Sequence, residues 1–465
     1  MITEKLARFV VETPLAAIPN EVLDGARAAY IDTLGVAIAG TLEPIADIAV
    51  RWVDELGARA QSTFWGQTLA TSPAEAAFVN GLCAHALDFD DSLPSLRGHP
   101  SPTMVPAALA VAEAAGASGA ETLAAHALGL EVAGKLGRAM GHGHYLRGWH
   151  STATIGAFAC TAAAARLWKL DVDQLRAAWG LTASQMSGLV RNFGTMTKPF
   201  HAGHAARTGV LSAWMAKHGF TADPAIFDGS NNVLDTYAGD DGVPLGQIVE
   251  KLGQPWEMLD PGIYVKRWAC CYCNHRPIGG LLELITQHGI TAGEVTAIEI
   301  GFPPGSDTAL VSTDPQTGLE GKFSIEYVAA ATVLDGKLTL ETFTDAMVQR
   351  PAVRALMAKT RRYRIEDKGT FSGVVGYNDV AIETTRGRYA LRVDKVPGSP
   401  AAPMTPQDRI EKFMDCAGRV LGAPGAQRLL DLLQRMGELP DARELLRATV
   451  PATTRAAQRT AGAAV

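Results

Sequence analysis

The sequence has neither a long basic run nor a long uninterrupted hydrophobic run. No basic stretch exceeds the pair Arg361-Arg362, and 42 Lys and Arg residues stand against 48 Asp and Glu residues. A protein that binds nucleic acid through its surface charge carries a basic excess, so that class is excluded. The longest run of small apolar residues, Ile155 to Arg166, is too short to cross a bilayer. We therefore expect no nucleic-acid partner and no membrane partner.

The N-terminal segment also lacks the apolar stretch of a secretory signal. Glu4, Lys5, Arg8 and Glu12 interrupt its apolar residues in an amphipathic pattern. We expect a cytoplasmic protein.

Cysteine is scarce, with six residues in 465, and three of them crowd into the segment 270–273. Neighbours that close cannot all form good disulfides with one another, so we expect reduced thiols. A zinc site of thiolates needs a second ligand pair at a distance. The remaining cysteines, Cys83, Cys160 and Cys416, stand singly in apolar helical contexts, so we predict no metal.

What the sequence has in abundance is Ala, Leu and Gly with helical spacing. Apolar residues make up 47% of the chain and charged residues 19%, enough to bury a large core. Up to about residue 220, apolar residues recur every three or four positions, which is typical of amphipathic or buried helices. The many small residues predict helices that cross closely. Residues 1–266 are thus predicted to form an all-helical domain.

The pattern changes to mixed α and β elements in the last third of the chain. Apolar and polar residues alternate over 294–302, which predicts a half-buried strand. Residues 379–393 are predicted to form two strands joined at Arg386-Gly387. A helix over 324–334 is expected to end at Asp335-Gly336. We predict a smaller α+β domain at 267–397.

Helical periodicity returns after a proline-rich break. Residues 398–450 are predicted to complete the helical domain, and 451–465 to form a flexible tail. The fold class is therefore mainly α, with a large all-helical domain and a smaller α+β domain.

A first candidate functional segment begins at His85 and contains both acid and imidazole groups. Asp88, Asp90 and Asp91 follow His85, and Arg97 and His99 come just before a predicted helix at Thr103. Functional side chains concentrate on loops held by a rigid scaffold. The alternative for such an acidic loop is a solvated capping segment.

A second candidate loop, residues 141–150, contains His142, His144, Tyr145 and His150. His150 directly precedes a buried helix, where it can face an anion at the helix N-terminus. We interpret His142 and His144 as surface residues.

The segment from Lys198 to Arg207 is the most informative. Pro199 suits a first helical turn, which places Lys198 at the helix N-terminus with His201 three residues later. The positive end of the helix and nearby basic side chains disfavour another positive charge. They can therefore lower the pKa of Lys198, which would let it serve as a base. The alternative is a solvated capping lysine.

Further along, Lys266, His275 and Arg276 can present positive charge to an anionic substrate.

Glycine-rich nucleotide loops are absent. The glycines at 141 and 143 follow a helix and lack the third glycine of a dinucleotide loop, and no phosphate-binding loop of the GxxxxGK[ST] type occurs.

These segments together resemble the MmgE/PrpD family over nearly the whole chain. The matching pieces are residues 31–40, 88–91, 99–100, 150–152, 198–203, Lys266 with the cysteine pair, His275 and 323–324. Members include 2-methylcitrate dehydratase, cis-aconitate decarboxylase and iminodisuccinate epimerase. The resemblance implies a homodimer, a small anionic substrate and a site that needs neither a metal nor an organic cofactor.

The family activities share one chemical demand, because a proton moves at carbon beside a carboxylate of a small di- or tricarboxylate. The resemblance implies catalytic roles for Lys198, Tyr145 and His99. It implies substrate binding by His150 and Lys266, and we predict the same role for Asp88, Asp91, Arg97, His201 and His275.

Among these activities the sequence most resembles iminodisuccinate epimerase. Epimerisation needs acid/base groups on opposite faces of one carbon, and Lys198 and Tyr145 offer such a pair. We therefore predict an isomerase, with a dehydratase or a cis-aconitate-type decarboxylase as the alternative. A non-catalytic dicarboxylate-binding paralogue is a remote alternative.

Overall fold

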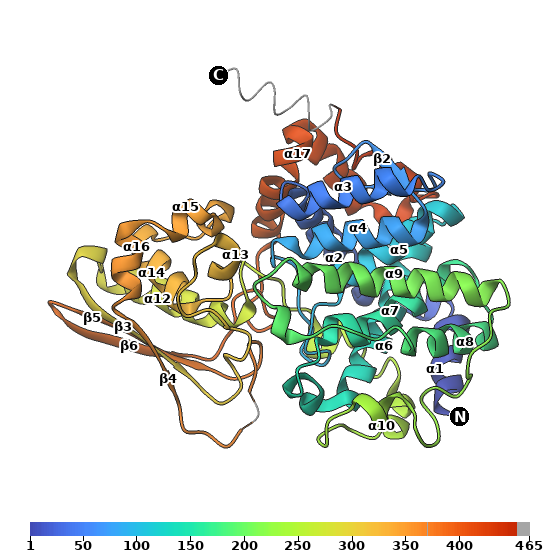
Figure 1. The fold of residues 1–465 in the computed structure, drawn as a ribbon, viewed down its shortest axis with the longest axis horizontal. Coiled ribbons are helices and arrows are strands. Elements are labelled where there is room, and N and C mark those ends of the chain that lie inside the picture. The colour runs from blue at the N-terminus through green and yellow to red at the C-terminus, as the bar shows by residue number, and fades with distance from the viewer. Residues whose placement is uncertain (370, 453–465) are drawn as a thin grey trace. The chain divides into compact units, whose positions relative to one another are not determined.

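The computed structural model describes residues 1–369 and 371–452 and divides the chain into two compact units (Figure 1). Unit 1 contains Met1–Arg191, Lys198–Ile263 and the segment from Pro406 onward. Unit 2 contains Asn192–Thr197 and Tyr264–Thr405. From residue 453 on, the predicted tail lies outside the described residues.

Unit 1 is built almost entirely of helices. They are α1 (Ile2–Glu12), α2 (Asn20–Gly40), α3 (Pro44–Leu56), α4 (Pro73–Ala86), α5 (Ser101–Ala115), α6 (Gly119–Leu146), α7 (Ser151–Leu167), α8 (Val172–Ala183), α9 (Thr197–Lys217), α10 (Val233–Tyr237), α11 (Leu245–Ile248), α17 (Pro406–Gln434) and α18 (Arg443–Arg447). Helices α2, α4, α5 and α7 lie in one layered stack (Figure 1). The predicted fold class, mainly α with a smaller α+β part, is confirmed.

Glycines let the central helices approach one another closely. A Cβ added to Gly81 in α4 would lie 2.7 Å from Cα of Gly203 in α9. A Cβ on Gly209 in α9 would lie 2.4 Å from Cβ of Cys160 in α7. Real Cβ atoms do not come that near, so only glycine permits these crossings. The predicted close helix crossings are confirmed, and they bring α4, α7 and α9 together.

Two local details of unit 1 differ from the prediction. Strands β1 (Ser62–Phe64) and β2 (Leu69–Thr71) form an antiparallel hairpin inside the domain predicted to be all-helical. Three residues are too few to show strand alternation, so no sequence pattern marks these strands. The second is that α6 kinks at Gly141, where φ is +69°, and continues to Leu146. The predicted loop at 141–150 is therefore helical in its first half.

Unit 2 is a four-stranded mixed sheet with helices packed against it. Its strands are β3 (Val295–Phe302), β4 (Thr360–Arg364), β5 (Asn378–Thr384) and β6 (Gly387–Val393), in the order β4-β3-β5-β6. Its helices are α12 (His275–His288), α13 (Gly318–Gly321), α14 (Ile325–Asp335), α15 (Asp345–Val348) and α16 (Pro351–Met357). Strands β3 and β4 pair in parallel and the other pairs are antiparallel.

The strands predicted at 294–302 and 379–393 are confirmed within one or two residues. The predicted stop of the helix at Gly336 is also confirmed, since this glycine caps α14 with φ +67°.

No single helix of the described residues combines the length and apolar character of a membrane span. Helices α2 and α3 meet the length and composition test only as a pair, with an 86° bend between them.

Candidate functional site

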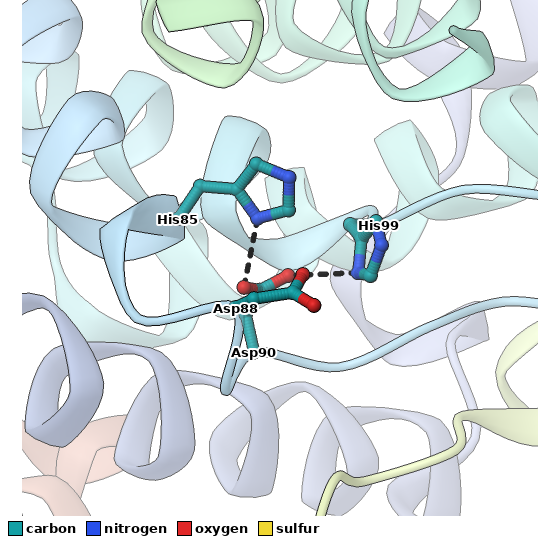
Figure 2. A group of neighbouring side chains, drawn as sticks. All are labelled: His85, Asp88, Asp90 and His99. Carbon is teal, nitrogen blue, oxygen red and sulfur yellow. Dashed lines mark hydrogen bonds and ion pairs between the residues drawn. The ribbon is translucent and has the colours of Figure 1, made fainter. Parts of the chain in front are cut away.

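The candidate site lies in unit 1, in the segment that connects α4 to α5. His85 occupies the last turn of α4, and His99 precedes the first turn of α5. Asp88 between them has φ +50°, a left-handed conformation that Asp adopts more readily than most residues. This turn gathers two carboxylates and two imidazoles (Figure 2).

Asp90 lies between the two histidines. Its Oδ1 accepts a hydrogen bond from Nδ1 of His85 at 2.8 Å, and its Oδ2 lies 2.9 Å from Nδ1 of His99 (Figure 2). Nδ1 of His99 also lies 2.8 Å from the carbonyl oxygen of Asp91, which can only accept. His99 therefore carries a proton on Nδ1, and in the neutral ring Nε2 keeps its lone pair.

Burial keeps the cluster apart from water. The side chains of His85 and Asp90 are fully buried, whereas that of His99 remains 14% exposed. Burial lowers the pKa of His85 to about 3, and the nearby Asp90 charge only partly opposes that shift. His85 is thus neutral at ordinary pH. His99 is the ring with the better access for a substrate.

Lys198 approaches the same turn from α9. Its Nζ donates to Oδ1 of Asp88 at 2.5 Å, and both side chains are almost completely buried. Lys198 lies in the first turn of α9, as predicted. The sequence interpretation considered only positive neighbours of this lysine, whereas the structure gives it a carboxylate partner.

His150 and His201 form a second imidazole pair beside the first. Their Nδ1 atoms lie 3.0 Å apart, so one ring donates a proton and the other accepts it. His150 precedes α7, and its ring centroid lies 6.0 Å from that of His85. Burial, and then neighbouring positive groups such as Lys198, lower the pKa of His201 to about 4. The pair is therefore neutral unless an anion binds near it.

Two buried contacts anchor the Asp88–Asp91 turn. Both carboxyl oxygens of Asp91 accept from Ser101, one from its backbone amide at 3.2 Å and one from its hydroxyl at 2.5 Å. Nζ of Lys412 in α17 donates to the carbonyl oxygen of Phe89 at 2.8 Å and pairs with Asp32 at 2.7 Å. Asp91 is therefore an anchor of the turn, and its predicted contact with substrate stays a prediction.

The loop 92–98 is docked on α6. The hydroxyl of Ser95 donates to Oε2 of the fully buried Glu257 at 2.6 Å, and Arg138 of α6 donates to Oε1 of the same residue. A Cβ on Gly137 in α6 would lie 2.3 Å from the carbonyl oxygen of Ser95. Arg97 in this loop is half-buried, and the negative group that acts on it is Asp241.

His142 and His144 are buried, so their interpretation as surface residues is wrong. His142 is 7% exposed and His144 only 1%. Nδ1 of His144 donates to the carbonyl oxygen of Tyr237 at 2.7 Å, and Nε2 lies 2.8 Å from the Thr154 hydroxyl. The extra turn of α6 beyond Gly141 folds these rings inward, which the polar composition of the segment concealed.

The other predicted site residues are Tyr145, Lys266 and His275. Tyr145 is half-buried near the C-terminal end of α6. Lys266 and His275 belong to unit 2, where both are buried and the His275 ring stacks on Tyr272 with 4.5 Å between centroids. The roles predicted for these three residues stay predictions.

His85 and Asp90 complete the cluster; both lie in the predicted segment, but the sequence prediction assigns neither of them a role. The sequence feature that could have identified them is their spacing: His85 lies in the last turn of α4, and Asp88 and Asp90 follow shortly after the helix ends. Sequence alone could not show that Asp90 faces both histidines, since that depends on the left-handed turn at Asp88.

The cluster has a composition that could hold a divalent metal. Ligand atoms of His85, Asp88, Asp90 and His99 all lie within 4.8 Å of one another. Imidazole and carboxylate groups suit first-row divalent metals. The sequence prediction judged ligand sets by their spacing along the chain and did not anticipate this group. In the structure the ammonium of Lys198 already bonds Asp88, so a metal would compete with it.

The fold and site define a class of protein: a helical scaffold that encloses imidazole, carboxylate and ammonium groups suited to proton transfer on an anionic ligand. The chain belongs to the MmgE/PrpD family, because residues 4–245 match the MmgE/PrpD N-terminal domain and residues 268–437 the MmgE/PrpD C-terminal domain. The family resemblance found in the sequence is thereby confirmed.

Similar proteins over the full length are cis-aconitate decarboxylases. The human enzyme is 26% identical over 95% of this chain and 92% of its own length. The mouse enzyme is 25% identical, covering 96% and 93%, and that of Aspergillus terreus is 24% identical, covering 96% and 95%. These relatives favour the decarboxylase alternative over the epimerase as the specific activity.

Proposed function

We propose that the protein is a lyase that removes a carboxylate as CO₂ from an unsaturated tricarboxylate of the cis-aconitate type. The observation that supports it is a buried histidine–carboxylate–lysine cluster in a chain that aligns over 95% of its length with human cis-aconitate decarboxylase. Epimerisation is the first prediction from sequence, whereas these relatives favour the decarboxylase alternative.

The chemistry requires one proton and a place for a developing negative charge. When the CH₂-bound carboxylate leaves as CO₂, its electron pair moves through the adjacent double bond to the carbon beside another carboxylate. That carbon then takes a proton, which leaves a dicarboxylate with a terminal methylene group. The enzyme must therefore hold the remaining carboxylates, stabilise the delocalised anion and supply the proton.

His99 is suited to supply the proton from Nε2. Its Nδ1 is fixed by the Asp91 carbonyl, and the adjacent Asp90 carboxylate stabilises the imidazolium that His99 must form before it donates. Lys198 brings a positive charge to the same turn, held by Asp88, and can attract a substrate carboxylate. In the neutral His150–His201 pair, the ring that accepts through Nδ1 carries its proton on Nε2 and can donate from there.

Epimerisation of iminodisuccinate remains the competing outcome. It would use Lys198 and Tyr145 from opposite faces of one carbon and release no CO₂. The two reactions are therefore distinguished by their products.

The direct test is CO₂ release from cis-aconitate by the wild type and by Lys198→Met. General acid/base and charge-stabilising groups contribute roughly 10²–10⁴-fold, so the variant should lose at least about 100-fold in kcat/KM. Lys217→Met is the matched control, since Lys217 lies exposed at the other end of α9. It should retain full activity.

Dialysis against a strong chelator gives a second arm of the experiment. If side chains alone transfer the proton, the dialysed enzyme keeps its rate. Loss of activity that a divalent metal restores would instead assign the four-residue cluster to metal binding. No CO₂ from the wild type would contradict the proposed reaction.

A further inference from the structure

His85 is a buried titratable residue that the proposed chemistry does not use. It forms its hydrogen bond to Asp90 through Nδ1, on the side of the ring that faces the carboxylate (Figure 2). Its Nε2 is fully buried and has no hydrogen-bond partner among the described residues. A buried polar side chain in the middle of a site calls for an explanation, because each unpaired buried atom costs free energy.

We propose that His85 is a positioning residue, whose Nδ1–H holds one oxygen of Asp90 so that the other oxygen faces Nδ1 of His99. The inference rests on the proposed acid/base role of His99. In this arrangement His85 transfers no proton to substrate, and its effect reaches the chemistry only through Asp90.

The geometry supports this assignment because Asp90 divides its two oxygens between two rings. One oxygen lies 2.8 Å from Nδ1 of His85 and the other 2.9 Å from Nδ1 of His99. A carboxylate turns about its last side-chain bond with a broad rotational preference, so contacts must fix its plane. Without the His85 donor, the Asp90 carboxylate would lose one of the contacts that set this plane.

His85 is itself well held for such a role. It lies in the last turn of α4, the helix that packs closely against α9 through Gly81 and Gly203. Its ring has two imidazole neighbours, with centroids 4.7 Å from His99 and 6.0 Å from His150, and those two lie 6.4 Å from each other. Contact with these neighbours limits ring rotation, so the Nδ1–H direction is preorganised.

The experiment compares His85→Ala with His85→Asn. The Asn side-chain amide can place an N–H near the position of Nδ1, whereas it has no atom near Nε2. Partners that orient a functional histidine are typically worth about 10–100-fold. We expect His85→Ala to lose that factor in kcat with little change in KM, and His85→Asn to recover most of it.

Two kinetic outcomes would overturn the proposal. Unchanged kcat in His85→Ala would show that Asp90 needs no such support. A folded His85→Asn variant as slow as His85→Ala would show that the reaction needs Nε2 rather than the Nδ1 donor. Thermal melting of both variants establishes that they are folded.

A second measurement needs no turnover, so it separates this proposal from the proposed function. Nitrogen NMR of the histidine-labelled protein reports the protonation of each nitrogen of His99, assigned by its loss in a His99→Gln variant. The His99 signals should shift in His85→Ala and return toward wild type in His85→Asn. Identical His99 signals in all three proteins would refute the positioning role even if no substrate were turned over.

Discussion

At the scale of single residues, burial decides the behaviour of the histidines. His85, His150 and His201 all have a lowered pKa whose first cause is burial. His126 in α6 is the simplest case, because it is fully buried, far along the chain from these groups and packed against the Tyr30 ring at 5.3 Å. Both of its ring nitrogens lack a hydrogen-bond partner among the described residues.

Burial lowers the pKa of His126 to about 4, and this predicts a loss of stability in acid. The unfolded chain binds a proton near pH 6.5 and the folded chain only near pH 4, so stability falls as the pH drops through this window. The shift corresponds to about 2 kcal/mol between pH 8 and pH 5. His126→Phe should therefore melt higher than wild type, and by more at pH 5 than at pH 8.

The exposed His218 offers a control for this effect. His218→Gln should leave the dependence of melting temperature on pH unchanged. If His126→Phe shows the same pH dependence as wild type, His126 is not held neutral by burial.

At the scale of elements, the loop 92–98 depends on a glycine in a neighbouring helix. Gly137 in α6 leaves room for the backbone of Ser95 and Leu96, which a Cβ would approach to 2.3 and 2.7 Å. Because these are backbone atoms, the loop rather than a side chain would have to move. The same loop leads directly into His99.

Gly137→Ala should therefore lower both stability and activity. We expect a loss of about 1–3 kcal/mol in the free energy of unfolding, the range for overpacking a core, and a lower kcat. Gly418→Ala in α17 is the matched control, since a Cβ there meets nothing within 4 Å. That variant should gain roughly 0.5–1 kcal/mol, because alanine favours a helix over glycine. Equal behaviour of the two variants in denaturant unfolding and turnover would contradict the docking of this loop on α6.

The elements themselves were largely predictable from sequence, and the site only in part. Period-two alternation predicted β3 and the β5–β6 pair, and Gly336 marked the end of α14. The position of Lys198 at a helix start followed from Pro199. The partner of that lysine, Asp88, lies 110 positions away in sequence, and no local pattern could reveal the pair. The burial of His142 and His144 was not predicted either. It depends on the kink of α6 at Gly141, which redirects the helix and which their polar composition does not indicate.

At the scale of the whole molecule, distant segments converge on one short turn. Lys412 of α17 bonds the carbonyl of Phe89, which lies 323 positions earlier, and Lys198 of α9 bonds Asp88. Helix α17 therefore helps to complete unit 1 around its candidate site.

The central claim is that this cluster removes CO₂ from an unsaturated tricarboxylate and protonates the remaining carbon. The most direct measurement is proton NMR of the wild-type protein in D₂O with cis-aconitate, iminodisuccinate and 2-methylcitrate in separate samples. The account predicts turnover of cis-aconitate, with CO₂ released and one deuterium on the saturated methylene carbon of the product. Deuterium exchange with inversion of iminodisuccinate and no CO₂ from cis-aconitate, or loss of water from 2-methylcitrate alone, would contradict it.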